Sequence, residues 1–136
     1  METVIAKYET GEDDFPNTLR SGGLFPCIAV GIFDRLSHHA YLIHEPNAAI
    51  DKNLPGFCRN VLGKSRKENL KVWVTGAAIF EDDEESTYVL GNRTYAETIM
   101  SEYFEDDQLF IQWLPNNTYG ELTNNTTSGE FTIIHY

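Results

Sequence analysis

Residues 27–44 read CIAVGIFDRLSHHAYLIH, and this stretch decides the fold. Two apolar runs, at residues 27–33 and 40–44, lie on either side of a polar segment at residues 34–39. Short apolar runs that are rich in β-branched and aromatic residues and separated by a polar turn predict adjacent strands. We therefore expect a β-hairpin in which Cys27 opens the first strand and His44 ends the second.

Further strands are predicted on both sides of this hairpin. Residues 4–8 read as a first strand and residues 71–80 as a buried one, while residues 109–114, 119–123 and 130–136 are also strand-like. Ser128-Gly129 predicts a turn before the last strand. The acidic residues 9–17 are predicted to be turn-rich, and EDDEES at residues 81–86 is predicted to be a solvated loop.

A first helix is predicted to begin near Asn53-Leu54-Pro55, because proline is tolerated in the first turn of a helix. The apolar residues that follow share one helical face: Phe57, Cys58, Val61 and Leu62. Cys58 is therefore expected to be buried and inert.

A second helix is predicted to begin with a capping box, which Thr94 and Glu97 have the spacing to form. Its apolar face is formed by Ala96, Ile99, Met100, Tyr103 and Phe104. Strands at both ends with two main helices between them predict one α/β (α+β) domain over residues 1–136, with one mixed sheet or layered β-sheets.

Composition disfavours several classes of partner. The 136 residues contain 21 Asp and Glu against 10 Lys and Arg, a formal net charge of −11, which repels nucleic-acid phosphates and anionic membranes. No apolar stretch approaches the ~20 residues of a membrane helix, and the first residues lack the features of a secretory signal. We expect a cytoplasmic protein with reduced cysteines, no nucleic-acid partner and no membrane insertion.

Metal and cofactor motifs are not evident in the sequence. His38, His39 and His44 lie close together but lack the spacing of a metal site, so solvated turn histidines are expected at His38 and His39. The acidic runs lack the ligand pattern of a calcium loop, and no phosphate-binding glycine motif follows Gly22-Gly23. We expect no metal and no cofactor.

The remaining candidate site pairs Cys27 with His44. A reactive cysteine needs its thiolate stabilised by a nearby histidine or a polar setting, and a hairpin with its turn near residues 36–38 brings Cys27 and His44 close together. If the two residues are directly opposite, their Cβ atoms lie ~4.5–5.5 Å apart. Spacing alone leaves the alternative open that both are simply packed residues of a hairpin.

The same residues resemble the chemoreceptor glutamine deamidase (CheD) family. In that family a T-L-G-x-G-S-C segment leads into a strand C-[VI]-A-V-x-[LIM]-x-D, and a histidine follows the cysteine by 17 positions. Here CIAVGIFD begins at Cys27, and His44 lies 17 positions later (44 − 27) and just before Pro46. Further motifs match in order along nearly the whole chain, at residues 56–62, 75–80, 90–94 and 128–131.

This resemblance implies a layered deamidase fold and a catalytic set of Cys27, His44 and Ser21. Ser21 stands where the family has a threonine, and Thr18 is a competing position. The Ser21 hydroxyl would accept a hydrogen bond from the second ring nitrogen of His44. The family's Gly-Ser before the cysteine is Phe25-Pro26 here, and the first glycine of its G-G-A strand is Thr75. Pro26 has no N–H, so an oxyanion donor must come from elsewhere, most simply the N–H of Cys27.

The activity implied is hydrolysis of a glutamine side-chain amide to glutamate with release of ammonia. The resemblance implies a protein substrate, typically the cytoplasmic domain of a chemoreceptor, and a CheC-like phosphatase as a partner. The open alternatives are a deamidase effector acting on another protein, a small-molecule amidase, and a catalytically inactive binding module that kept the fold.

Overall fold

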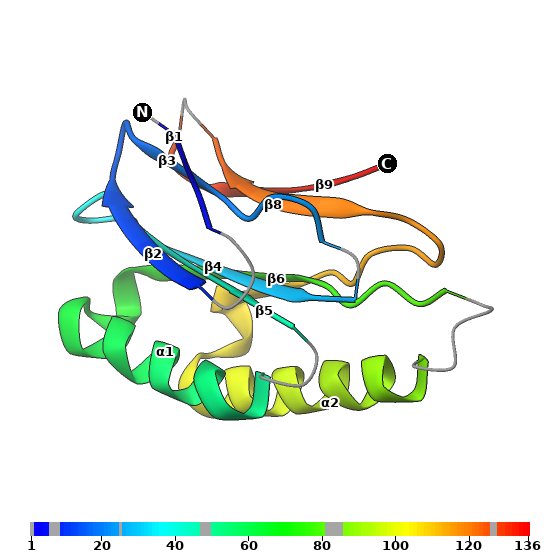
Figure 1. The fold of residues 1–136 in the computed structure, drawn as a ribbon. Helices are drawn as coiled ribbons and strands as arrows, with labels where there is room; N and C mark the ends of the chain where they lie inside the picture. Colours follow the sequence, from blue (N-terminus) through cyan, green and yellow to red (C-terminus); the bar gives the residue numbers. More distant parts are fainter. Residues whose placement is uncertain (1, 6–8, 25, 47–49, 81–85, 126–127) are drawn as a thin grey trace.

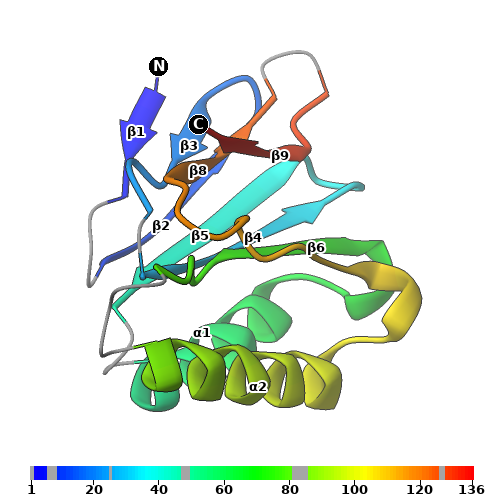
Figure 2. The same ribbon diagram turned by 90° about the vertical axis from the view of Figure 1, so that its right-hand side faces the viewer.

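The computed structural model describes residues 2–5, 9–24, 26–46, 50–80, 86–125 and 128–136. In this part of the chain the elements form three layers, shown in Figures 1 and 2: two helices, a five-stranded sheet and a four-stranded sheet. The prediction of an α+β fold with layered sheets and two helices is confirmed.

The five-stranded sheet is the middle layer, in the order β2-β5-β4-β6-β7. Its strands are β2 (Glu9–Asp14), β4 (Ile28–Asp34), β5 (His39–Glu45), β6 (Leu70–Gly76) and β7 (Leu109–Ile111). All neighbours are antiparallel except β6 and β7. The predicted hairpin is confirmed as β4 and β5, so β4 lies at the centre of the sheet with every residue buried.

The outer sheet has the order β1-β3-β8-β9. It consists of β1 (Glu2–Val4), β3 (Thr18–Arg20), β8 (Gly120–Asn124) and β9 (Phe131–His135), with β1 and β3 parallel. The helices, α1 (Ile50–Lys64) and α2 (Ser86–Tyr103), cover the other face of the middle sheet (Figure 1). Two short 3-10 helices, η2 (Lys67–Asn69) and η3 (Asp106–Gln108), precede β6 and β7.

Alternate residues of β4 build two separate cores. Ile28, Val30 and Ile32 face the helices, where Cys58 and Met100 are also buried. Ala29 and Phe33 face the outer sheet, in a second core with Leu42, Trp73 and Phe131. The two faces of one strand therefore hold all three layers together.

Several predicted boundaries are wrong. The acidic residues 9–17 contain a strand, β2, rather than turns alone, and α1 begins at Ile50 instead of near Asn53. Thr94 lies inside α2, where its hydroxyl donates to the Leu90 carbonyl, so it does not cap a helix start. Residues 6–8 of the first predicted strand and 81–85 of the predicted loop lie outside the described residues.

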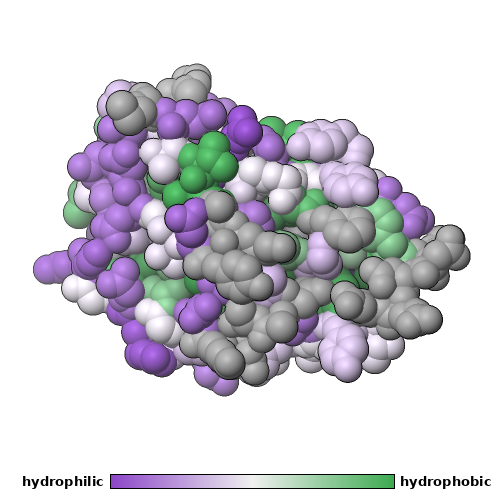
Figure 3. All heavy atoms as spheres, viewed as in Figure 1, coloured by the Kyte–Doolittle hydropathy of each residue, from purple (hydrophilic) through white to green (hydrophobic). Residues whose placement is uncertain are grey.

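The acidic strand β2 is held at the sheet edge by charge pairing. The two ring nitrogens of His39 on β5 contact the carboxylates of Asp14 and Glu12, and Lys64 of α1 also binds Glu12. His39 is therefore a paired residue and not the solvated turn histidine that the sequence predicted. Hydrophilic residues also predominate on the side of the molecule where β2 and β3 lie (Figure 3).

The His39 cluster predicts a pH-dependent stability. Burial lowers the pKa of His39, but the hydrogen bonds and charges of Asp14 and Glu12 outweigh burial and raise the pKa above its usual value. A raised folded-state pKa means that the stabilisation is fully present below about pH 6.5, the unfolded value, and is lost as the pH rises through the folded value. We expect His39→Asn to lower the free energy of unfolding more at pH 6 than at pH 9. An equal loss at both pH values would contradict this.

The second prediction concerns Gly31, where the two sheets approach each other. A Cβ at Gly31 would lie 2.7 Å from Cγ of Phe131, closer than atoms pack without displacement. Gly31→Ala is expected to lower the free energy of unfolding by about 1–3 kcal/mol, measured by urea denaturation. The control is Gly91→Ala in α2, where a Cβ meets nothing within 4 Å. It should stabilise by up to about 1 kcal/mol, and a similar loss in both variants would refute the packing argument.

Candidate active site

The register of the hairpin fixes how Cys27 and His44 lie relative to each other. His44 is paired with Ala29, and Ile28 with Glu45, so the position opposite Cys27 is residue 46. Cys27 and His44 are therefore diagonal neighbours rather than directly opposite. Such neighbours have Cα atoms about 7–8 Å apart, which is within reach of long and aromatic side chains.

Both side chains lie on the face of the middle sheet that is covered by the outer sheet. Cys27 belongs to the same apolar cluster as Ala29 and Leu42, and His44 alternates along β5 with Ile43, which faces the helices. Cys27 is 8% exposed and His44 is 4% exposed. The structure thus brings the predicted pair to one buried face, at the end of β4 and β5 away from the hairpin turn.

The imidazole of His44 is oriented by the backbone. Its Nδ1 lies 2.9 Å from the carbonyl oxygen of Ile5, directly after β1. A carbonyl can only accept, so Nδ1 carries the proton and donates it, and in the neutral ring Nε2 keeps its lone pair. Nε2 is buried and has no hydrogen-bond partner among the described groups. This is the tautomer that a general base requires.

Ser21 does not perform the orienting role that the resemblance implied. Its hydroxyl donates to the Gly22 carbonyl at 2.8 Å and accepts from the backbone N–H of Leu122 at 2.9 Å. Both bonds lie within the outer sheet, and the Ile5 carbonyl takes the place at Nδ1 that was expected for Ser21. Thr18, the competing position, is buried on β3.

Thr75 is a residue of this site that the sequence analysis noted only as a departure from a motif. It pairs with Ala29 from the β6 side, so His44, Ala29 and Thr75 form one row across β5, β4 and β6. Thr75 is completely buried, and its hydroxyl makes no hydrogen bond within the described part of the chain. A hydroxyl-bearing residue directly after the apolar run VWV, residues 72–74, was the available signal.

The end of β6 fixes the backbone of Cys27. Gly76 has φ +102°, and a Cβ there would overlap the carbonyl oxygen of Cys27. Ala77 has φ +48°, donates its N–H to the same Cys27 oxygen at 2.8 Å, and has its own carbonyl bound by Nε and one terminal nitrogen of Arg93 from α2. The strand predicted at residues 71–80 therefore ends at Gly76, because the positive φ angles of Gly76 and Ala77 turn the chain there.

The second cysteine has a very different environment. Cys58 lies in α1 with no exposed surface, against the sulfur of Met100. Burial raises the pKa of the Cys58 thiol to about 12. The expectation that Cys58 is buried and inert thus agrees with its environment.

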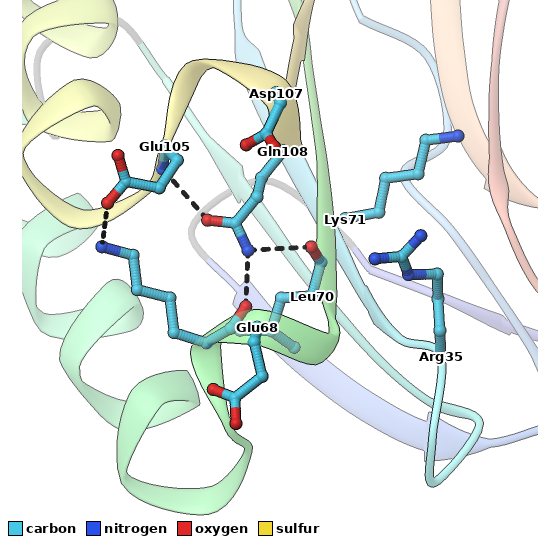
Figure 4. A pocket seen from close by; sticks show the side chains of 8 residues that line it. Arg35, Glu68, Leu70, Lys71, Glu105, Asp107 and Gln108 are labelled. Carbon is cyan, nitrogen blue, oxygen red and sulfur yellow. Dashed lines mark hydrogen bonds and ion pairs between the residues drawn. The ribbon is translucent and has the colours of Figure 1, made fainter.

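A pocket of about 520 Å³ lies at the opposite end of β6. Its centre is the carboxamide of Gln108, which donates to the carbonyls of Lys67 and Leu70 and accepts from the N–H of Glu105 (Figure 4). Lys67 is paired with Glu105. These groups join η2 to η3, and the lining contains no cysteine, histidine or serine, so we regard the pocket as a structural junction.

The described residues contain neither a metal-binding cluster nor a membrane-spanning helix. Within the described ranges, no three His, Cys, Asp or Glu side chains could hold a metal ion. In the same ranges, no helix is long and apolar enough to cross a bilayer.

Comparison with known proteins shows the fold alone. No family model matches the sequence, and no curated protein matches it either. Among solved structures, the Bacillus licheniformis hypothetical protein YfiH is similar with a TM-score of 0.56 at 8% identity, over 76% of this chain and 49% of that one. The chain therefore spans about half the length of that protein. The likeness supports the layered α+β fold, while the resemblance to the glutamine deamidases stays a prediction from sequence motifs.

The clamp on Ala77 predicts that Arg93 stabilises the turn beside Cys27. Arg93→Ala removes two charge-assisted hydrogen bonds and is expected to cost about 1–3 kcal/mol of unfolding free energy. Adding Ala77→Gly should recover part of this loss, because glycine adopts a positive φ without strain. The control is Arg59→Ala, which removes an exposed contact with Tyr103 and should cost less than about 0.5 kcal/mol. Equal losses for Arg93 and Arg59 would show that the clamp has no special role.

Proposed function

We propose that this protein is a cysteine-dependent amidohydrolase that converts the side-chain amide of a protein glutamine to a carboxylate and releases ammonia. Cys27 is the nucleophile and His44 is the general base and acid. The observation that carries the proposal is the state of His44: Nδ1 is held by the Ile5 carbonyl, and Nε2 is buried without a described partner on the face that also carries Cys27.

The unpaired Nε2 of His44 lowers the stability of the fold, and a role in a reaction gives a reason to keep it. A buried polar atom that makes no hydrogen bond costs about 1–3 kcal/mol, and an apolar side chain would fill the same place without that penalty. The proton on Nδ1 leaves the lone pair on Nε2 available to the neighbouring strand, where Cys27 lies. The geometry therefore favours a role in proton transfer over a role in packing.

The proposed reaction has two steps. In the first, Nε2 of His44 takes the thiol proton, the Cys27 sulfur attacks the amide carbon, and the protonated His44 gives its proton to the departing nitrogen, which leaves as ammonia. The product is a thioester at Cys27. In the second step His44 accepts a proton from water, the hydroxide attacks the thioester carbon, and the C–S bond breaks. The Cys27 thiolate takes the proton back from His44, and the product carboxylic acid ionises to glutamate.

The competing proposal is a catalytically inactive binding module that kept the fold, and Pro26 favours it. Proline has no N–H, and the loss of one oxyanion donor costs about 10²–10³ in rate, which a domain without activity would tolerate. The resemblance suggests a CheC-like phosphatase as a docking partner for such a module. The reactivity of the Cys27 thiol distinguishes the two proposals, because a binding module needs no activated thiolate.

The test is the pH dependence of iodoacetamide alkylation, followed separately at Cys27 and Cys58 by peptide mass spectrometry. We expect Cys27 to react with an apparent pKa below about 8.5, the value of a free thiol, and His44→Ala to remove that depression. Cys58 is the internal control and should stay unreactive in the folded protein. If Cys27 is inert or behaves like a free thiol, the binding-module proposal replaces this one.

A second assay tests the substrate class directly. Wild-type protein is incubated with the cytoplasmic domain of a chemoreceptor, and ammonia release and conversion of glutamine to glutamate are measured. Cys27→Ala should abolish the conversion, whereas Cys58→Ala should leave it nearly intact. Equal activity of Cys27→Ala and wild type would exclude Cys27 as the nucleophile.

A further inference from the structure

We propose that the hydroxyl of Thr75 is a catalytic oxyanion donor of the Cys27 site, hydrogen-bonding the carbonyl oxygen of a primary carboxamide substrate. This inference rests on the proposed function, since an oxyanion forms only if Cys27 attacks a carbonyl group. Thr75 thereby joins Cys27 and His44 in the site. The oxygen of the substrate amide faces Thr75, and its nitrogen faces His44.

Packing does not explain the choice of threonine at this position. Thr75 is completely buried, yet its Oγ1 has no hydrogen-bond partner in the described structure. Valine has nearly the same shape and would avoid the penalty for a buried hydroxyl without a partner. Among the described residues, the hydroxyl is thus a donor without an acceptor.

The register places this donor beside the nucleophile. Cys27 precedes β4 by one residue and continues its ladder with β6, because the Cys27 carbonyl accepts from the N–H of Ala77. Thr75, two residues before Ala77, is therefore the diagonal neighbour of Cys27 on the β6 side, as His44 is on the β5 side. The residue between His44 and Thr75 in the row is Ala29, which presents only a methyl group.

The two flanking groups suit the two ends of a carboxamide. When the Cys27 sulfur bonds to the amide carbon, the π electron pair of the C=O bond moves to the oxygen, which becomes the oxyanion. The oxygen points to the Thr75 hydroxyl, which donates a hydrogen bond, and the nitrogen points to Nε2 of His44, which supplies the proton for leaving. Collapse of the intermediate restores the C=O bond and breaks the C–N bond.

The residue before the nucleophile removes one backbone donor from the site. Pro26 carries no N–H, so its own backbone nitrogen cannot donate to an oxyanion, which leaves the N–H of Cys27 as the nearest backbone donor. A hydroxyl from β6 supplies a donor on the other side of the same sulfur. The two residues are thereby explained together: Pro26 lacks a backbone donor, and Thr75 supplies a hydroxyl donor.

The experiment compares two reactions of Cys27 that differ in whether an oxyanion forms. Acylation by p-nitrophenyl acetate passes through a tetrahedral oxyanion, whereas alkylation by iodoacetamide is a direct displacement without one. Both rates are measured at Cys27 by peptide mass spectrometry in wild type, Thr75→Val and Thr75→Ser. Thermal and urea unfolding of each variant reports on a structural role.

We expect Thr75→Val to slow acylation by about 10²–10³ while alkylation changes by less than about twofold. Thr75→Ser keeps the hydroxyl and should retain most of the acylation rate. The unfolding free energy of Thr75→Val should equal or exceed that of wild type, because the variant removes a buried hydroxyl without a partner.

Three outcomes would overturn the inference. Wild-type acylation rates in Thr75→Val would show that the hydroxyl is not a donor. Parallel loss of acylation, alkylation and stability would show that Thr75 acts through the structure. Failure of wild-type Cys27 to be acylated faster than a free thiol would overturn the proposed function and this inference with it, and the wild-type rate alone identifies that case.

Discussion

The central strand β4 is the constraint on which the rest of the structure depends. Every residue of β4 is buried, so the strand has no solvent face, and its neighbours β5 and β6 complete both of its ladders. Its even-numbered apolar residues pack on the helices and its odd-numbered ones on the outer sheet. Gly31 is required in this alternation because the ring of Phe131 occupies the place of a side chain there.

A strand buried in this way makes polar groups on the neighbouring strands expensive. Other buried polar side chains have partners: Asp34, at the end of β4, accepts from the N–H groups of Leu36 and Ser37, and the Ser21 hydroxyl, beside the outer sheet, accepts from the N–H of Leu122. His44 Nε2 and Thr75 Oγ1 are unpaired, and they occupy the same row on either side of Ala29. These two unpaired polar atoms near Cys27 are the observations on which the proposed reaction rests.

Local patterns predicted the hairpin, the layers and both helices, because apolar runs and helical periodicity depend only on nearby residues. The register of the hairpin was not predictable from these patterns. It depends on the turn, where His38 has φ +62° and donates its N–H to the Asp34 carbonyl, and this turn pairs Asp34 with His39. That pairing, five residue pairs away, is what makes Cys27 and His44 diagonal neighbours.

Other predictions were wrong because the deciding partners are distant in sequence. The strand β2 looks like a loop by composition, but its backbone pairs with β5 along its whole length, and His39 and Lys64 bind its carboxylates. The hydrogen bond that orients His44 was expected from a side chain, but the backbone carbonyl of Ile5 makes it. Every residue has a backbone carbonyl, so the sequence gives no sign of which one will be the acceptor. For the same reason Thr75 could be seen in the sequence but not given a role until β6 was placed beside β4.

The position of Cys27 at the end of a strand is compatible with the proposed reactivity of its thiol. Within β4 its sulfur would be enclosed like that of Cys58, whose surroundings raise the thiol pKa to about 12. One residue before β4, the cysteine retains 8% exposure while its carbonyl is held by Ala77, and Ala77 is held in turn by Arg93. Fixing the backbone in this way places the side chain at the edge of the core, between His44 and Thr75.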